Sequence, residues 1–280
     1  MAKRSIFDLG DGETDHEDTG IDGRSRHQVA EMAIAHKVSE LSVGPGELTG
    51  VDANRTLTIA WLSTIDYQAA LELQEAIAEA RLHDELGDVL LLLEHPHVYT
   101  LGRGADERFI INPGAIPVCR VSRGGQVTYH GPGQLIGYPI VKLEGADRDV
   151  IRYLRRLEQV VIESLATLGI AAHRCAGMTG VWLGEEKVAS IGVGFRRWVS
   201  RHGFALNVAT DLHYFDAIVP CGIAGCRMTS LNARGFGAIT SEMVGEIVSC
   251  RFAAVFGYQQ VLRADKVELL ALKAAAETHS

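Results

Sequence analysis

From residue 57 onward, the hydrophobic positions of the chain follow two patterns, one typical of helices and the other of strands. Residues 66–86, 149–168 and 241–256 carry apolar side chains three and four positions apart, as amphipathic helices do. Short apolar runs predict strands at residues 57–62, 88–93, 138–143, 181–183, 187–193 and 203–208. Because these strands and helices do not alternate regularly, we expect an α+β fold with a mixed β-sheet and flanking helices.

The first 50 residues differ from the rest of the chain. They are rich in Asp, Glu, Gly, Ser and Thr and contain no aromatic residue after Phe7. Such a segment cannot bury enough apolar surface to offset the entropy lost on ordering. The sequence therefore predicts an acidic, disordered extension over residues 1–50 and a single domain over residues 51–280, with its core at about 84–259.

Composition and charge exclude several classes of protein. The net charge is −8, and residues 1–22 hold seven acidic but only two basic side chains, so a polyanion-binding body is not indicated. The longest aliphatic run, Val89 to Leu93, is too short to span a membrane, and the start has no apolar signal segment. Five irregularly spaced cysteines are typical of reduced thiols. We expect a cytoplasmic protein that binds neither nucleic acid nor membrane.

A glycine-rich stretch at residues 123–134 is the first candidate for chemistry. Its glycines would let backbone N–H groups approach a ligand, and Arg123, Thr128, Tyr129 and His130 add polar side chains. It lacks both the Gly-Lys-Ser/Thr of a phosphate-binding loop and the glycine spacing of a dinucleotide-binding loop. A turn-rich hairpin with a hydrogen-bonded histidine explains the same residues.

A lysine and a cysteine are the other candidates. Lys187 begins an apolar strand, so its side chain lies near the core or, on an edge strand, reaches solvent. Cys221 lies between Pro220 and Gly222, a context that suits an accessible thiol, although a lone cysteine is more often a small buried hydrophobic residue. Cys221 and Cys226 with His213 match zinc-ligand spacing poorly.

Taken together, these segments resemble the octanoyltransferases of protein lipoylation, the LipB family. The resemblance covers about residues 57–260 in the family's order. It is carried by EHPHVYTLGR, RGGQVTYHGPGQLIGYPIV, GEEKVASIGV, HGFALNV, YFDAIVPCGI and TSL.

The resemblance implies a fold like the catalytic domain of biotin and lipoate protein ligases, with one acyl pocket. It also implies an acyltransferase, a lipoyl(octanoyl) transferase, that needs no cofactor and no metal. Cys221 matches the family's acyl-accepting nucleophile, and Lys187 matches the lysine that lowers the pKa of that thiol and exchanges protons. The matching substrate-binding positions are Arg123, Gly124, Gly125, Gln126, Val127, Thr128, Tyr129, His130, Ser190, Ile191, Gly192, Gly203, Phe204 and Ala205.

The implied reaction is the first step of endogenous protein lipoylation. An octanoyl group moves from octanoyl-acyl carrier protein, through a cysteine thioester, to a specific lysine of a lipoyl domain. The implied acceptors are the lipoyl domains of 2-oxoacid dehydrogenases and the glycine cleavage H protein. The alternatives are an ATP-dependent lipoate–protein ligase on the same fold and a non-catalytic module that binds lipoyl domains or acyl carrier protein.

An acidic carrier protein would dock most readily on a local basic surface. Two arginine clusters are candidates for that surface. They are Arg152, Arg155 and Arg156 in the predicted helix, and Arg196, Arg197 and Arg201 near Trp198.

Overall fold

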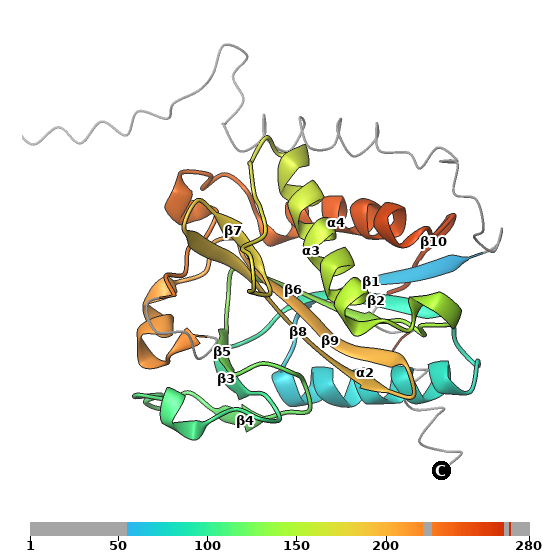
Figure 1. Cartoon of the computed structure of the whole chain (residues 1–280), viewed down its shortest axis with the longest axis horizontal. Helices are drawn as coiled ribbons and strands as arrows, with labels where there is room; N and C mark the ends of the chain where they lie inside the picture. Colours follow the sequence, from blue (N-terminus) through green and yellow to red (C-terminus); the bar gives the residue numbers. More distant parts are fainter. Residues whose placement is uncertain (1–54, 221–225, 266–268, 270–280) are drawn as a thin grey trace, which may run out of the picture.

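The computed structural model describes residues 55–220, 226–265 and 269 (Figure 1). The predicted extension over residues 1–50 and the candidate nucleophile Cys221 lie outside the described residues. No helix in the described part of the chain is long and apolar enough to cross a membrane.

A seven-stranded mixed sheet forms the centre of the described structure, as the sequence predicts. β1 runs parallel to both β2 and β10, whereas the other neighbouring strands are antiparallel. In spatial order the strands are β10 (Gln260–Arg263), β1 (Thr56–Thr64), β2 (Asp88–Glu94), β6 (Gln134–Ile140), β9 (Val199–Asn207), β8 (Glu186–Arg196) and β7 (Val181–Leu183).

A second sheet of three short strands packs beside the first. Its order is β4 (Val118–Arg120), β3 (Val98–Leu101) and β5 (Val127–His130). β5 continues through a tight turn into β6 of the large sheet, so this turn connects the two sheets. The glycine-rich stretch at residues 123–134 therefore includes strand β5. β6 begins at Gln134, four residues before the start of the strand predicted at 138–143.

Helices cover both faces of the large sheet (Figure 1). α3 (Val150–Thr167) and α4 (Ser241–Phe256) lie on one face, and α2 (Tyr67–Leu82) lies on the other. α3 and α4 pack against β8 and β6 with a core that contains Leu157, Val161 and Phe252. The three helices occupy the predicted segments, and the bounds of α4 match the prediction.

The buried face of α2 differs from the predicted one. The pattern places Ala69, Ala76 and Ala80 beside Leu73 on the core stripe, but these alanines are only partly buried. The buried residues are instead Tyr67, Ala70, Leu73, Gln74, Ile77 and Ala78. Because the buried face includes the polar residue Gln74, the apolar pattern of the sequence does not identify this face. Gln74 Oε1 accepts a hydrogen bond from His202 N at 2.8 Å.

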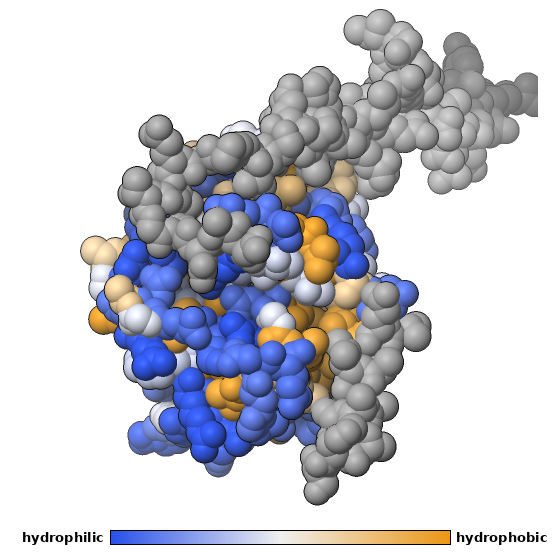
Figure 2. Space-filling view, turned by 90° about the vertical axis from the view of Figure 1, so that its right-hand side faces the viewer, coloured by the Kyte–Doolittle hydropathy of each residue, from blue (hydrophilic) through white to orange (hydrophobic). Residues whose placement is uncertain are grey.

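The side of the molecule that carries β1 and β10 is largely hydrophilic, with some hydrophobic side chains among the polar ones (Figure 2). β10 is the last strand in the order of the large sheet, and its Val261 and Leu262 are 39% and 56% exposed. The strand is only four residues long, and short edge strands offer little template for pairing with another chain.

A buried carboxylate joins the first strands to the end of the domain. Asp88, 4% exposed at the start of β2, accepts hydrogen bonds from Arg81 Nε at 2.8 Å and from Tyr258 Oη at 2.7 Å. It also accepts from Arg55 Nη2 at 3.2 Å and from the backbone N of Lys142 at 3.0 Å. The four donors come from separate parts of the chain and meet at one carboxylate. Its negative charge balances the positive charges of the two arginines, which are poorly solvated there.

We expect Asp88→Asn to lower the free energy of unfolding by about 3–5 kcal/mol, because it removes the anion and leaves two arginines without their shared partner. Urea denaturation measures this loss. The control is Asp84→Asn, which removes a 64% exposed carboxylate that also pairs with Arg81. A loss no greater in Asp88→Asn than in Asp84→Asn would contradict the role given to the buried carboxylate.

Candidate active site

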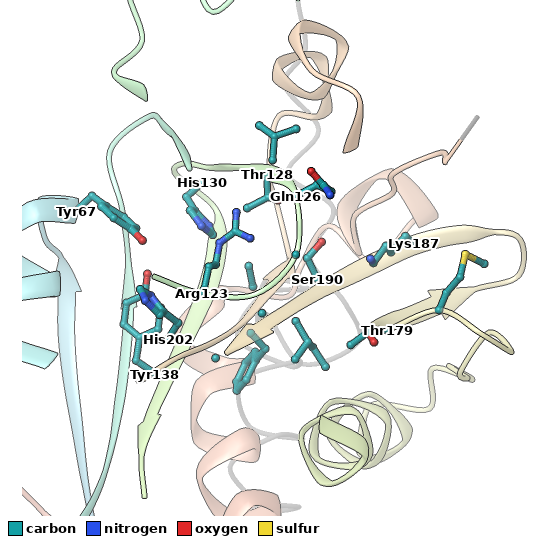
Figure 3. Close-up of a pocket in the computed structure, with 18 of the residues that line it drawn as sticks. Tyr67, Arg123, Gln126, Thr128, His130, Tyr138, Thr179, Lys187, Ser190 and His202 are labelled. Carbon is teal, nitrogen blue, oxygen red and sulfur yellow. The ribbon is translucent and has the colours of Figure 1, made fainter. Parts of the chain in front are cut away.

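A cavity of about 240 Å³ lies between the glycine-rich stretch at residues 123–134 (hereafter the glycine-rich hairpin) and strands β8 and β9 (Figure 3). Lys187 and Thr179 stand at one end, and Tyr67, His130, Tyr138 and His202 gather at the other. Arg123 and Ser190 lie between them. The complete lining is Tyr67, Arg123, Gly125, Gln126, Val127, Thr128, His130, Tyr138, Gly177, Met178, Thr179, Lys187, Ser190, Ile191, Gly192, His202, Gly203, Phe204 and Ala205.

The structure brings Lys187 and most of the predicted substrate-binding positions to this cavity. Twelve of those positions line it, and Gly124 and Tyr129 do not. The side chains of a strand alternate between its two faces, so Thr128 and His130 face the cavity while Tyr129 points away. Tyr129 is fully buried against Tyr99 and Phe215, and its hydroxyl is 2.7 Å from His97 Nδ1. The structure thus assigns Tyr129 to the packing of the small sheet.

Lys187 lies inside the sheet rather than at its edge. It is 2% exposed, and its strand β8 has β7 on one side and β9 on the other, which excludes an edge lysine that reaches solvent. Its Nζ is 5.2 Å from the ring centroid of Trp182, close enough for a cation–π contact. The position of Lys187 in β8 therefore places its amino group at the wall of the cavity.

The chain that follows the candidate nucleophile runs beside Lys187. The backbone N of Lys187 donates to Arg227 O at 2.8 Å, and Lys187 O accepts from Thr229 N at 2.9 Å. Upstream, 3₁₀ helix η3 (Leu212–Ala217) leads towards Pro220, and Val219 N donates to Phe109 O at 2.8 Å. Both flanks of residues 221–225 are thus held by hydrogen bonds, and the downstream flank lies against the start of β8.

The glycine-rich hairpin is held against β8 by backbone contacts. Gly124 N donates to Val193 O at 2.9 Å. A Cβ at Gly192 would lie only 3.1 Å from Gly124 O, so a side chain there would push the two segments apart. Arg123, 7% exposed, donates to Gly124 O at 3.0 Å and to Thr100 O at 2.8 Å. These contacts make the hairpin a fixed wall.

Hydrogen bonds set the tautomer of His95, the first histidine of the EHPHVYT segment. Its Nδ1 is 2.7 Å from Ile65 O, which can only accept, so Nδ1 carries the proton. The other nitrogen, Nε2, then accepts from Tyr138 Oη at 2.8 Å. Burial lowers the pKa of His95 to about 4, so the ring is neutral at physiological pH. This neutral ring orients the hydroxyl of Tyr138, which lines the cavity.

A chain of buried hydrogen bonds connects His130 with the backbone of Lys187. Gln134 donates through Nε2 to Asn207 Oδ1 at 2.9 Å, which leaves its Oε1 to accept from His130 Nδ1 at 2.8 Å. Asn207 Nδ2 then donates to Thr229 O at 2.9 Å, and Thr229 N donates to Lys187 O. Burial holds the pKa of His130 well below its usual range, so it remains a neutral hydrogen-bonding group.

His202 and Ser190 each bring a buried polar atom to the cavity. Neither His202 Nδ1 nor Ser190 Oγ has a hydrogen-bond partner within the described part of the chain. Burial, followed by the charges of Arg123 and Arg201, lowers the pKa of His202 to about 3. These atoms are free to interact with whatever fills the cavity.

Several lining residues are not singled out by the sequence analysis. Tyr138 and His202 lie within two of the motifs that carry the resemblance. Their place in these motifs is the feature of the sequence that could have predicted their position at the cavity. Tyr67 and the segment 177–179 are distant from those motifs in sequence and reach the cavity only through the packing of α2 and the loop before β7. No local pattern identifies them.

The thiols of two other cysteines are poor nucleophiles. Burial raises the pKa of Cys119 and of Cys250, so both thiols stay protonated at neutral pH. Within the described residues, no three His, Cys, Asp or Glu side chains gather in a way that could hold a metal ion.

The neutral histidines predict how stability depends on pH. Their folded pKa values lie below the unfolded value of 6.5, so the unfolded chain binds more protons between pH 6.5 and about 4, and stability falls as pH falls. We expect the free energy of unfolding to drop by roughly 2 kcal/mol for each of His95 and His202 between pH 7 and pH 5. Urea denaturation at the two pH values measures the drop.

The variant His95→Gln isolates one contribution. It should reduce the difference in stability between pH 7 and pH 5 by roughly 2 kcal/mol. His83→Gln makes the same chemical change at a 56% exposed histidine and is the matched control. An unaltered difference in His95→Gln would show that this histidine is not held neutral.

Comparison with known proteins matches the sequence of this chain to one family. The family described as lipoyl protein ligase A/B catalytic domain matches residues 66–253. The octanoyltransferase of Solibacter usitatus is 49% identical over 213 residues, which cover 74% of this chain and 96% of that protein. The octanoyltransferase of Gloeobacter violaceus is 49% identical over 197 residues, covering 70% of this chain and 88% of that protein.

Solved structures confirm the fold. Protein Ta0514 of T. acidophilum with bound lipoic acid superposes with a TM-score of 0.62 at 17% identity, covering 78% of this chain and 92% of that one. A lipoate-protein ligase A bound with ATP superposes with a TM-score of 0.59 at 17% identity, covering 79% of this chain and 93% of that one. The predicted α+β fold of lipoate ligases is therefore confirmed.

The sequence match covers 96% and 88% of the two relatives, and residues from three of the segments that carry the resemblance line one cavity. The chain therefore belongs to the lipoyl protein ligase A/B catalytic-domain family and, within it, to the octanoyltransferases, the acyltransferases of protein lipoylation.

Proposed function

We propose that this octanoyltransferase takes its acyl group from octanoyl-acyl carrier protein and carries it as a thioester on Cys221. The observation that supports this best is the buried ammonium of Lys187, which lines the cavity while the chain that follows Cys221 is hydrogen-bonded to the lysine's own backbone. A cation beside a thiol favours the thiolate, which is the nucleophilic form.

In the first half-reaction, the thiolate of Cys221 attacks the carbonyl carbon of the donor thioester. The new S–C bond forms as the bond to the carrier's sulfur breaks. The ammonium of Lys187 donates a proton to the departing thiolate, which leaves as a thiol, and the lysine becomes a neutral amine. In the second half-reaction, the amine of a lysine on the acceptor attacks the acyl-enzyme. The N–C bond forms, Cys221 leaves as a thiolate, and Lys187 accepts the proton that the amine loses.

The cavity suits an acyl chain with a carbonyl at one end. Backbone N–H groups at Cys221 and in the glycine-rich hairpin are proposed to stabilise the oxyanion of each tetrahedral intermediate. Ile191 and Phe204 provide apolar surface along the cavity, and burial of the chain contributes about 0.8 kcal/mol per CH₂ group. The fixed hairpin wall keeps the donors in place before the reaction begins.

The proposed acceptors are lipoyl domains, including those of 2-oxoacid dehydrogenases, and the glycine cleavage H protein. One structural relative, a bi-partite lipoate protein ligase of Thermoplasma acidophilum, is described together with its E2 lipoyl domain. We place the reaction in the cytoplasm, where Cys221 stays reduced. We assign it to a single domain over residues 51–280, preceded by an acidic extension.

Ion pairs offset part of the charge of the two arginine clusters considered for docking the acidic carrier. Arg152 and Arg156 both pair with Asp147, at 3.5 and 3.3 Å. In the second cluster, Arg196 pairs with Glu79 at 2.5 Å and Arg201 with Glu75 at 3.1 Å. Because Arg152 and Arg156 share a single carboxylate, the ion pairs offset only part of the positive charge, and both clusters remain candidates for the docking surface.

We expect the wild-type protein to gain one octanoyl group when mixed with octanoyl-acyl carrier protein, and intact mass spectrometry detects the adduct. Cys221→Ser should gain none, because a hydroxyl is not ionised at neutral pH. Cys226→Ser, a neighbouring cysteine with no proposed role, is the control and should keep the adduct. An adduct on Cys221→Ser, or its absence from the wild type with an active donor, would rule out the thioester.

Dependence on ATP separates transfer from the ligase alternative, which shares the fold. We expect octanoyl transfer from the carrier to a lipoyl domain to proceed at the same rate with and without ATP and Mg²⁺, because the donor thioester is already activated. Mass spectrometry of the lipoyl domain measures the transfer. A reaction that stops when ATP is removed, or that accepts free octanoate only with ATP, would identify a ligase.

A further inference from the structure

A buried glutamate outside the cavity contacts the loop that forms one of the cavity's walls. Glu158 lies in the middle of α3, and its side chain is 0% exposed. Its carboxylate accepts from Arg174 Nε at 2.8 Å, from Arg155 Nη1 at 2.7 Å and from the backbone N of Gly180 at 3.1 Å. Two guanidinium groups and one backbone donor therefore balance an anion that would otherwise be costly to bury.

The loop held by Glu158 begins at Arg174 and ends at Gly180. Arg174 also donates to Arg155 O at 2.9 Å and to Gln159 Oε1 at 2.7 Å, which binds the start of the loop to α3. At its far end, Gly180 is buried and donates to Glu158. Between these two points, residues 177–179 line the cavity.

Gly180 is in direct contact with the catalytic lysine. A Cβ at Gly180 would overlap Cε of Lys187 and lie 3.1 Å from its Nζ, so the lysine side chain lies against this glycine's backbone. The residue also has φ +138°, a conformation that favours glycine. Lys187 is therefore packed against a backbone segment whose N–H is fixed by Glu158.

We propose that Glu158 is a positioning residue for Lys187. Its carboxylate fixes Gly180 and the 174–180 loop, and this loop in turn holds the lysine ammonium against the cavity. The inference rests on the proposed function, because it concerns the lysine that activates Cys221. A well-packed apolar side chain at position 158 would fill the same space at no electrostatic cost, but it could not accept the hydrogen bond from Gly180.

The test is the rate at which iodoacetamide alkylates Cys221, followed by mass spectrometry from pH 5 to pH 10. A displaced lysine raises the pH at which the thiolate forms, and one pKa unit corresponds to about tenfold in thiolate at neutral pH. We expect Glu158→Gln to slow alkylation about tenfold at pH 7 and to match the wild type at pH 10. Lys187→Ala removes the lysine's charge altogether, so it gives the largest shift in the alkylation profile that displacement of this lysine can cause.

Two further variants make the result specific. Gly180→Ala leaves the carboxylate intact and displaces Lys187 directly, so it should reproduce the shift even if Glu158→Gln does not fold. Glu246→Gln makes the same chemical change on α4, where the carboxylate pairs with Arg263, and should keep the wild-type profile. Thermal denaturation confirms that each variant is folded.

The possible results separate the inference from the proposed function. A folded Glu158→Gln protein with a wild-type alkylation profile would overturn the positioning role, and so would a folded Gly180→Ala protein with that profile, because the lysine would then not depend on the position of this loop. If Lys187→Ala also leaves the profile unchanged, or if the wild type forms no octanoyl adduct, the proposed function itself fails. A shift in Glu158→Gln and Gly180→Ala, with none in Glu246→Gln, is the result expected from the positioning role.

Discussion

The burial of one positive charge governs the arrangement of the whole site. Lys187 is 2% exposed in the interior of a seven-stranded sheet, and an ammonium in such a place destabilises the fold unless its surroundings compensate it. The surroundings include the Trp182 ring, the backbone of Gly180 and a segment that hydrogen-bonds to the backbone N and O of the lysine. Gly180 directly follows residues 177–179, which line the cavity, so the backbone that packs against the lysine continues into a cavity wall.

The other end of the cavity is polar but uncharged. His95 and His202 are kept neutral by burial, and His130 is neutral and hydrogen-bonded to Gln134. Neutral rings can orient hydroxyl groups and fix the hairpin without competing with Lys187 for the charge of a thiolate. The buried polar chain from His130 to the backbone of Lys187 joins the two ends through continuous hydrogen bonds.

Much of the fold can be predicted from the sequence, because its long elements have clear periodicity. α4 and β7 have the predicted bounds, and the strand that carries Lys187 begins one residue before its predicted start. The small sheet and β10 are missed because each of their strands has only three or four residues and includes polar ones, whereas the equally short β7 is entirely apolar. The buried face of α2 is misassigned because Gln74 lies in the core, where it serves a hydrogen bond from His202 rather than hydrophobic packing. The site follows the same rule: motifs identify the residues of the hairpin and of β8, whereas Tyr67, the 177–179 loop and Glu158 reach or hold the cavity only through tertiary contacts.

The most direct test of this arrangement is a crystal structure of the octanoyl-loaded enzyme. The acyl chain should extend from Sγ of Cys221 into the cavity between the glycine-rich hairpin and β8, with Nζ of Lys187 within hydrogen-bonding distance of the thioester group. The chain's apolar part should contact Ile191 and Phe204. An acyl chain bound to another residue or lying outside this cavity, or a Lys187 side chain turned away from the thioester, would contradict the account.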